Sequence, residues 1–162
     1  MAPHGYRMLE PGGGESLSFL GDSLLLLKTP GDEADGAVAF YEYIAAPSAQ
    51  GSPQHVHRGH DETFYVVEGN LEFTLGAATV AADPGSFLLV PRGQPHGFRN
   101  AGQSKGRIVG TFNSARFAQY FRELAQIIER TGAAPDLRDW TKLYSRYDTS
   151  FYDPRLTDRA EP

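Results

Sequence analysis

The stretch QHVHRGHDETFYVVEG, residues 54–69, decides the fold and the chemistry expected of this chain. It holds three of the chain's five histidines, and a glutamate follows the last of them by two positions. His55 and His57 have one residue between them, and alternate side chains of a β-strand point to the same face. Glu62 begins the next β-rich run after a short connection, so its carboxylate can turn back to that face. This pattern indicates two imidazoles and one carboxylate converging on one point, a combination that suits a divalent transition metal.

A His-x-His pair alone does not establish a metal site, because such pairs also occur as packed or surface residues. A third ligand must come from elsewhere, and the remaining histidines are His4, His60 and His96. His96 lies in PGSFLLVPRGQPHGFRN, residues 84–100, after a β-rich run and a turn of proline and glycine. His60 is interpreted as a loop residue or a neighbour of a ligand, and His4 as part of a mobile end.

The composition narrows the class of protein. The chain has 162 residues, of which 40% are hydrophobic and 22% charged, as expected for a globular chain with a sizeable core. Its net charge of -5 and the lack of a basic stripe argue against nucleic acid and anionic membranes as partners. Without cysteine it has no disulfide and no thiolate ligand. The longest apolar run, Leu24–Leu27, is too short to span a bilayer, and no signal-peptide core precedes it, so we expect a cytoplasmic protein.

Short β-rich runs, separated by glycine and proline turns, fill the first two thirds of the chain. Their close spacing predicts an all-β sandwich or barrel. The expected strands are Leu24–Lys28, Ala37–Ala45, Thr63–Glu68, Leu71–Leu75, Ser86–Val90 and Arg107–Phe112.

The pattern changes near residue 114, where apolar residues recur at helical spacing. Ser114 is a plausible N-cap and Gly132 a plausible stop, which predicts a helix over about residues 115–131 packed on the sheet. The aromatic tail, 133–162, is expected to dock on the body or on a partner subunit. We find no internal repeat, so one domain over 1–162 is expected, with its barrel core at about 17–113. The apolar positions of the helix are Phe117, Tyr120, Phe121, Leu124, Ile127 and Ile128.

Two segments resemble the paired motifs of the cupin superfamily. Residues 51–69 resemble the first motif, with one departure: three residues separate its leading glycine from the first histidine, where the usual pattern has five. Residues 85–100 match the second motif at every position. The matching residues are Gly51, His55, His57, Glu62 and Gly69 in the first motif and Gly85, Pro91, Gly93, His96 and Asn100 in the second.

Less specific likeness extends over nearly the whole chain. The segments LEPGGGESLSFLG, AFYEYIAAP and YSRYDTSFYDP are similar to parts of small bacterial single-domain cupins of the quercetin dioxygenase type. The resemblance implies a double-stranded β-helix (a cupin or jelly-roll barrel) with a C-terminal α-helix. It also implies that His55, His57, Glu62 and His96 bind one divalent ion, which can be Fe, Mn, Ni, Zn, Co or Cu.

The function implied by the resemblance is a metal-dependent dioxygenase that acts on a small organic molecule, with dioxygen as co-substrate. Glu62 would serve as a ligand and as a catalytic base. Two alternatives stay open: a non-redox isomerase, cyclase or lyase with the same metal site, and a ligand-binding or sensory cupin without turnover.

A pocket can be predicted from strand parity. If Gly69-Asn70 is a two-residue hairpin loop, Val66 pairs with Phe73 and Phe64 pairs with Leu75. These four residues then share the face of Glu62, and one further aromatic residue shares the face of His96. The alternative is that they only fill the barrel. The predicted substrate pocket comprises Phe64, Val66, Phe73, Leu75 and Phe98.

Three further polar residues are interpreted as structural. Tyr41 and Tyr43 are read as strand packing residues instead of catalytic acids. Asp61 is read as a solvated loop charge, with a hydrogen bond to a ligand histidine as the alternative.

The N-terminal segment and Leu24–Leu27 carry more apolar surface than one small barrel needs, and cupins of this kind are commonly dimers. We therefore expect a homodimer.

Overall fold

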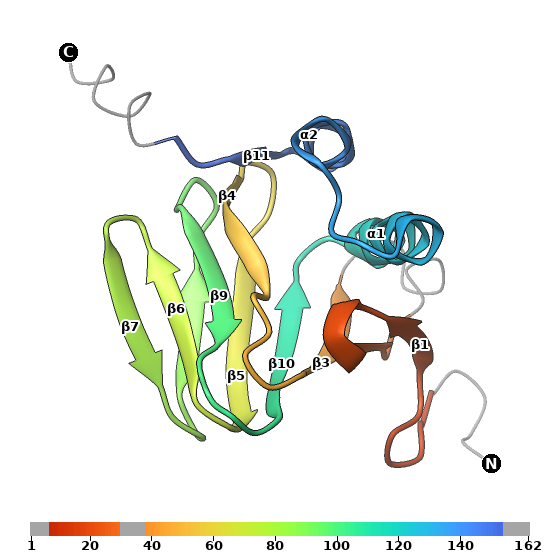
Figure 1. Cartoon of the computed structure of the whole chain (residues 1–162), viewed down its shortest axis with the longest axis vertical. Helices are drawn as coiled ribbons and strands as arrows, with labels where there is room; N and C mark the ends of the chain where they lie inside the picture. The colour runs from red at the N-terminus through yellow and green to blue at the C-terminus, as the bar shows by residue number, and fades with distance from the viewer. Residues whose placement is uncertain (1–6, 30–37, 154–162) are drawn as a thin grey trace.

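The computed structural model describes residues 7–29 and 38–153 (Figure 1). His4 and the first residue of the expected strand Ala37–Ala45 lie outside the described residues. Over the described part, the chain forms eleven strands, a short 3-10 turn and two α-helices. They are β1 (Glu15–Ser18), η1 (Leu20–Asp22), β2 (Leu24–Leu27), β3 (Ala39–Ala45), β4 (Ser52–His57), β5 (Glu62–Glu68), β6 (Leu71–Leu75), β7 (Ala78–Ala82), β8 (Phe87–Val90), β9 (His96–Asn100), β10 (Gly106–Phe112), α1 (Phe117–Thr131), α2 (Leu137–Ser145) and β11 (Thr149–Phe151).

The strands form two antiparallel sheets that face each other. One sheet has the order β1-β2-β3-β10-β5-β8, and the other has the order β11-β4-β9-β6-β7. From β4 to β10 the chain passes repeatedly between the sheets, with β6 and β7 as the hairpin at the turning point. This is the double-stranded β-helix that was expected, and the prediction of a mainly β fold with a C-terminal helix is confirmed. The second helix, α2, lies in the segment that was expected only to dock as a tail. Neither helix of the described part is long and apolar enough to cross a membrane.

All six expected strands form, five of them with ends displaced by one or two residues. The strand that His55 and His57 indicate forms as β4, and His96 begins β9. The strands without a prediction, β1, β7 and β11, are short, lie at or near sheet edges and have weak apolar patterns. Such strands depend on pairing with a neighbour, which the local sequence does not reveal.

The helix prediction is correct at its C-terminal end and wrong at its start. Gly132 follows α1 with φ 65°, and its N–H bonds to the carbonyl of Ile128, as the predicted stop requires. Ser114 is not the N-cap, because α1 begins at Phe117. The carbonyl of Ser114 accepts a hydrogen bond from the Phe117 N–H, so a tight backbone turn starts the helix without a side-chain cap.

The Gly69-Asn70 hairpin was predicted wrongly. β5 pairs with β10 and β8 in one sheet, whereas β6 pairs with β7 and β9 in the other, so this connection crosses between the sheets. Gly69 has φ +89°, and a Cβ there would lie 2.7 Å from the Cα of Gly106. The crossing chain therefore passes against the start of β10 at a distance that only glycine allows.

Aromatic side chains from both sheets meet in the core. The rings of Phe64 and Phe73 lie 5.1 Å apart, and those of Phe64 and Phe98 lie 5.8 Å apart. α1 contacts β1, β3 and α2, and so covers one end of the larger sheet (Figure 1). Leu25, Leu26 and Leu27 of β2 are buried within the chain. They therefore do not supply the surplus apolar surface on which the homodimer prediction partly rested.

Two glycines allow a test of the crossover. Gly69→Ala should destabilise the fold by roughly 2–4 kcal/mol, from a strained positive φ together with overpacking against β10. Gly85→Ala is the matched control, since Gly85 has φ +94° but open space around it, so its loss should be about 1 kcal/mol. Urea unfolding of both variants measures the difference. Equal losses would show that the close passage at Gly69 does not matter.

Candidate metal centre and its cavity

The four predicted ligands lie together between the two sheets. His55 and His57 are on β4, and His96 begins the neighbouring β9, directly opposite His55 in the strand register. Glu62 begins β5 in the facing sheet. All four residues are buried, and one ligand atom from each lies within 4.8 Å of the others. The cluster thus joins the two sheets at one end of the barrel.

Backbone carbonyls set the orientation of two imidazoles. His55 Nδ1 is 2.7 Å from the carbonyl oxygen of Pro53, and His96 Nδ1 is 3.1 Å from that of Gln94. A carbonyl oxygen can only accept, so Nδ1 must carry the proton in both rings. Each neutral ring then directs the lone pair of Nε2 into the centre, as a metal ligand must.

The hydroxyl of Thr149, in the C-terminal segment, orients the imidazole of His57. His57 Nδ1 lies 2.9 Å from Thr149 Oγ1, and that hydroxyl donates its own proton to the carbonyl of Tyr147, 2.9 Å away. Thr149 must therefore accept from His57 Nδ1–H, which leaves His57 Nε2 with a free lone pair. Thr149 belongs to β11, which pairs with β4. The local sequence offered no signal for this partner.

The centre consequently consists of atoms that donate electron pairs. The Nε2 atoms of His55 and His57 are 3.0 Å apart, and Glu62 Oε2 lies 3.1 Å from His57 Nε2 and 2.9 Å from His96 Nε2. Lone pairs at these separations need a cation or a proton between them. Three imidazole nitrogens and a carboxylate oxygen suit a divalent transition metal, so the residues fit the ion that the cupin resemblance implies.

The charges of the four ligands agree with this fit. Burial lowers the pKa of His55 well below its usual value and also lowers that of His57, which favours the neutral rings that bind metals. Burial alone would lower the pKa of His96 and raise that of Glu62. The contacts between these residues reverse both directions, and together with His57 they hold the Glu62 pKa at about 2. Glu62 is therefore an anion at neutral pH.

Tyr41 contacts the cluster directly. Its hydroxyl donates a hydrogen bond to Glu62 Oε1 over 2.8 Å, and burial together with the Glu62 charge raises its pKa well above 10.0. The side chain therefore remains a donor. The interpretation of Tyr41 as a strand packing residue alone missed this contact, because the two residues lie on strands that the sequence does not place together.

Two residues of the corner between β4 and β5 are structural neighbours of the cluster. The His60 ring packs between those of His57 and Phe117, 4.3 Å from each, and burial lowers its pKa to about 4. It is not part of the ligand cluster. Asp61 accepts hydrogen bonds from Arg92 and Asn113, with 2.9 Å to the Arg92 backbone nitrogen. It therefore ties this corner to the turn before β9. Asp61 is a partly exposed loop charge, as predicted, but it is paired with Arg92 and does not bond a ligand histidine.

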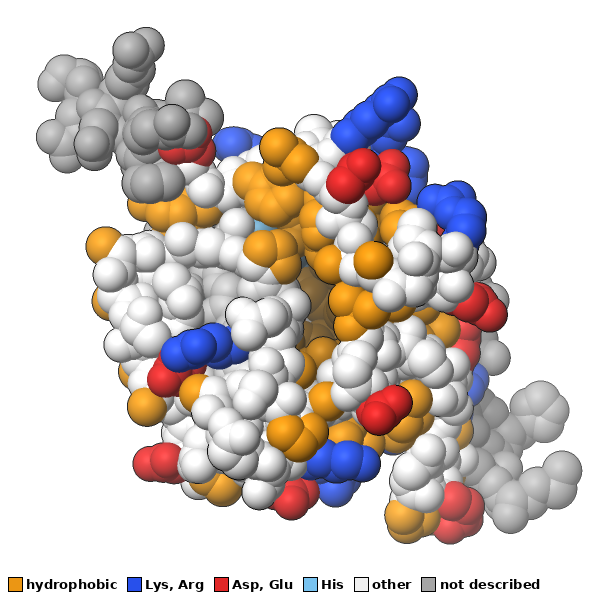
Figure 2. Space-filling view, viewed as in Figure 1, with side chains coloured by type: hydrophobic (Ala, Val, Ile, Leu, Met, Phe, Trp, Pro, Cys, Tyr) orange, Lys and Arg blue, Asp and Glu red, His pale blue; other side chains and the backbone are white. Residues whose placement is uncertain are grey.

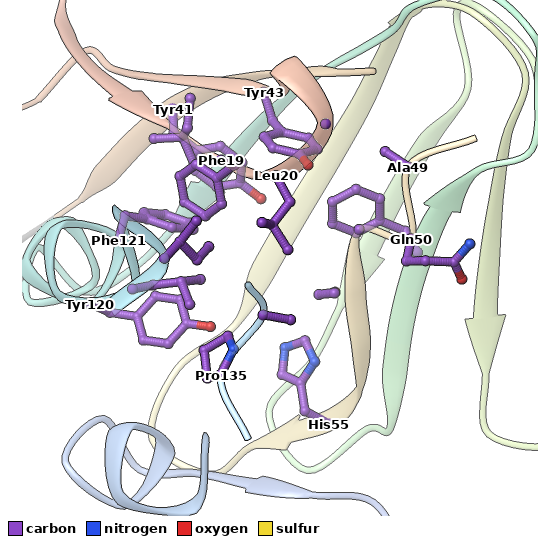
Figure 3. Close-up of a pocket in the computed structure, with 18 of the residues that line it drawn as sticks. Phe19, Leu20, Tyr41, Tyr43, Ala49, Gln50, His55, Tyr120, Phe121 and Pro135 are labelled. Carbon is purple, nitrogen blue, oxygen red and sulfur yellow. The ribbon is translucent and has the colours of Figure 1, made fainter. Parts of the chain in front are cut away.

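A cavity of about 440 Å³ leads to the cluster and is the hollow ringed by hydrophobic side chains in Figure 2. It lies between the larger sheet, η1, α1 and the connection from α1 to α2. The labelled side chains in Figure 3 approach it from these elements, from the connection between β3 and β4, and from β4, with His55 at one end. Among the described lining residues, Glu62 is the one Asp, Glu, Lys or Arg. The aromatic lining residues are Phe19, Tyr41, Tyr43, Phe98, Phe112, Phe117, Tyr120, Phe121 and Trp140.

This cavity differs from the predicted pocket. Of the five predicted residues, Phe98 lines it, whereas Phe64, Val66 and Phe73 are buried in the core and Leu75 packs against that core. Strand parity correctly placed Phe64 and Val66 on the inner face with Glu62, whereas the predicted pairs Val66–Phe73 and Phe64–Leu75 do not form, because β5 and β6 lie in different sheets. Strand parity did not reveal that α1 and the connection after it close over the opposite side of the cluster, because that depends on packing between distant segments.

The fold and this cluster define a class: double-stranded β-helix proteins with a buried three-histidine, one-glutamate centre. The family model described as "Cupin domain" matches residues 41–112. Quercetin 2,3-dioxygenase from Bacillus subtilis (strain 168) is 29% identical over 122 residues, which cover 75% of this chain and 35% of that one. These matches support a small protein of the cupin superfamily, and the chain spans about a third of the length of the curated relatives it matches.

Solved structures share the fold. An RmlC-like cupin from Shewanella frigidimarina NCIMB 400 superimposes with a TM-score of 0.57 at 20% identity, covering 68% of this chain and 94% of that one. The polyketide cyclase RemF from Streptomyces resistomycificus gives a TM-score of 0.58 at 18% identity, with coverage of 66% and 78%. At these identities the likeness establishes the fold.

Thr149 allows a test of how the cluster is oriented. Thr149→Val keeps the shape but removes the acceptor of His57 Nδ1–H, so affinity for Zn²⁺ or Co²⁺ should fall on the order of 10- to 100-fold. Thr149→Ser retains the hydroxyl and should bind the metal nearly as the parent chain does. Titration against a chelator of known affinity measures both. Unchanged affinity in the valine variant would rule out this role for Thr149.

Proposed function

We propose that this protein is a metal-dependent enzyme that acts on an uncharged, aromatic small molecule, and that the reaction is a dioxygenation of the quercetinase type. The observation that carries the proposal is the cavity, which joins an aromatic lining to a buried cluster of metal-ligand type. The sequence likeness to quercetin 2,3-dioxygenase over 75% of the chain supports the reaction type.

The lining argues for the charge and shape of the substrate. A phosphate or carboxylate in a buried site needs a cationic partner, and the described lining residues include no lysine or arginine. The rings of Tyr41 and Phe121, 4.8 Å apart, and of Tyr43 and Phe98, 5.7 Å apart, offer apolar faces to a flat ring system. A cavity of about 440 Å³ suits a molecule of a few fused or linked rings.

The metal, when bound, would supply a Lewis acid that polarises substrate oxygens and a redox-active centre for dioxygen, if it is iron, manganese, nickel, cobalt or copper. His55, His57, His96 and Glu62 would hold it. The aromatic walls would orient the substrate with its hydroxyl groups toward the cluster and exclude water. Glu62, an anion that lines the cavity, would take the proton of a substrate hydroxyl and return it when the product leaves.

A non-redox reaction is the second candidate. The aromatic lining also suits an aromatic polyketide, and that lining favours a polyketide over a sugar substrate. In that case Glu62 would move a proton between positions of the substrate, and dioxygen would take no part. A cytoplasmic location and a homodimer stay predictions from the sequence.

Oxygen uptake separates the candidates. The protein is reconstituted in turn with Fe²⁺, Mn²⁺, Ni²⁺, Co²⁺, Cu²⁺ or Zn²⁺, and quercetin serves as the flat polyphenol probe. We expect quercetin to bind, with one dioxygen consumed per molecule converted by at least one of the redox-active ions. Conversion without oxygen uptake would establish a non-redox enzyme, and binding without conversion a ligand-binding protein. Stronger binding of a sulfated quercetin than of quercetin would contradict the uncharged-substrate argument.

Glu62→Gln distinguishes a base from a mere ligand. The amide retains the shape but loses the charge and the proton acceptor, so turnover per bound metal should fall by about 10²–10⁴-fold. His60→Ala is the matched comparison from the same corner, and it should retain most turnover per metal. Metal content and turnover are measured on the same samples. If activity of Glu62→Gln merely follows metal occupancy, Glu62 is a ligand only.

A further inference from the structure

The two carboxylate oxygens of Glu62 have different partners. Oε2 faces the Nε2 atoms of His57 and His96, at 3.1 and 2.9 Å. Oε1 points away from them and accepts the hydrogen bond of the Tyr41 hydroxyl, at 2.8 Å. Both side chains are buried, with Tyr41 and Glu62 each 3% exposed, so water does not compete readily for this contact. Only one oxygen of Glu62 is therefore presented to the three imidazoles.

The sheet needs a special feature to make this contact. Tyr41 is on β3 and Glu62 on β5, with β10 between them, and Tyr41 pairs with Gly110 of β10. The Tyr41 ring lies over Gly110. A Cβ at that position would stand 2.5 Å from Tyr41 Cε1 and closer still to Cζ and the hydroxyl oxygen. Gly110 has no positive φ. The absence of a side chain at Gly110 therefore allows the Tyr41 ring to cross over β10.

Neighbouring rings hold Tyr41 in place once it has crossed. Phe112 stacks on it at 5.7 Å with an interplanar angle of 25°, and Phe121 of α1 packs at 4.8 Å. The hydroxyl is thus directed at Glu62 by packing on two sides. A tyrosine that served only as core filling would not need a glycine beneath its ring or a hydrogen bond to a member of the ligand cluster.

We propose that Tyr41 is a positioning residue that holds Glu62 as a one-oxygen ligand, and that Gly110 is the position that admits it. This inference rests on the proposed metal-binding function. A carboxylate that gave both oxygens to the ion would occupy a further coordination position. By retaining Oε1, Tyr41 keeps that position available to a substrate oxygen from the cavity, which both Tyr41 and Glu62 line.

The visible spectrum of the Co²⁺-loaded protein tests the proposal without turnover. The d–d absorption of Co²⁺ weakens as its coordination number rises. Tyr41→Phe retains the ring and removes the hydroxyl, which frees Oε1, so the band should shift and lose intensity. Tyr43→Phe is the matched control, because Tyr43 lies on the same strand and lines the same cavity but makes no hydrogen bond to Glu62. Its Co²⁺ spectrum should equal that of the parent chain.

Gly110→Ala supplies an independent variant. It retains the Tyr41 hydroxyl but displaces the ring, so its Co²⁺ spectrum should change in the same direction as that of Tyr41→Phe. If Gly110→Ala does not fold, Tyr41→Phe decides the matter. A Tyr41→Phe protein that binds Co²⁺ with the parent spectrum would overturn the role of Tyr41 and leave the metal site intact. A parent chain that binds no Co²⁺, Zn²⁺ or Fe²⁺ would instead overturn the proposed function, and this inference with it.

Discussion

The convergence of three imidazole lone pairs and one carboxylate on a single buried point is the constraint on which the rest of the structure depends. These groups repel one another unless a cation or a proton lies between them, and burial makes that repulsion costly. The surrounding elements therefore fix each group from outside: carbonyls behind His55 and His96, Thr149 behind His57, and Tyr41 behind Glu62. The barrel, the tail and the helices all contribute to this one arrangement.

The position of the cluster also explains why the cavity that leads to it is lined by aromatic side chains. The core beyond the ligands is filled by rings such as Phe64 and Phe73, so the cluster is accessible from the side where α1 covers the larger sheet. That side is lined by Phe19, which precedes η1, and by aromatic residues of β3 and α1. Because the rest of the described lining carries no Asp, Glu, Lys or Arg, the charge of Glu62 acts in largely apolar surroundings, where electrostatic interactions are stronger than in water.

Hydrogen bonds also connect the cluster to segments of the chain that contribute none of its four residues. β11 and α2 belong to the C-terminal tail, yet Thr149 of that tail orients a ligand histidine. Asp61 joins the corner after β4 to Arg92 before β9, so the segments that carry the two motifs are held together as one unit. The tail and the corner thus help to fix the geometry of the cluster through hydrogen bonds to backbone and imidazole groups.

The sequence by itself determined most of the strands, the main helix apart from its start, and the four clustered residues. Their signals are local: side-chain alternation along β4, the turn before His96, and the helical spacing from Phe117. Only the tertiary structure decided the partners of those residues. The Gly69-Asn70 connection crosses between sheets instead of forming a hairpin, and Thr149 reaches His57 across 92 positions of sequence. The cavity, Tyr41 and Gly110 likewise depend on which strands become neighbours. Non-local pairing of this kind is set by packing of the whole chain, and no short window of sequence records it.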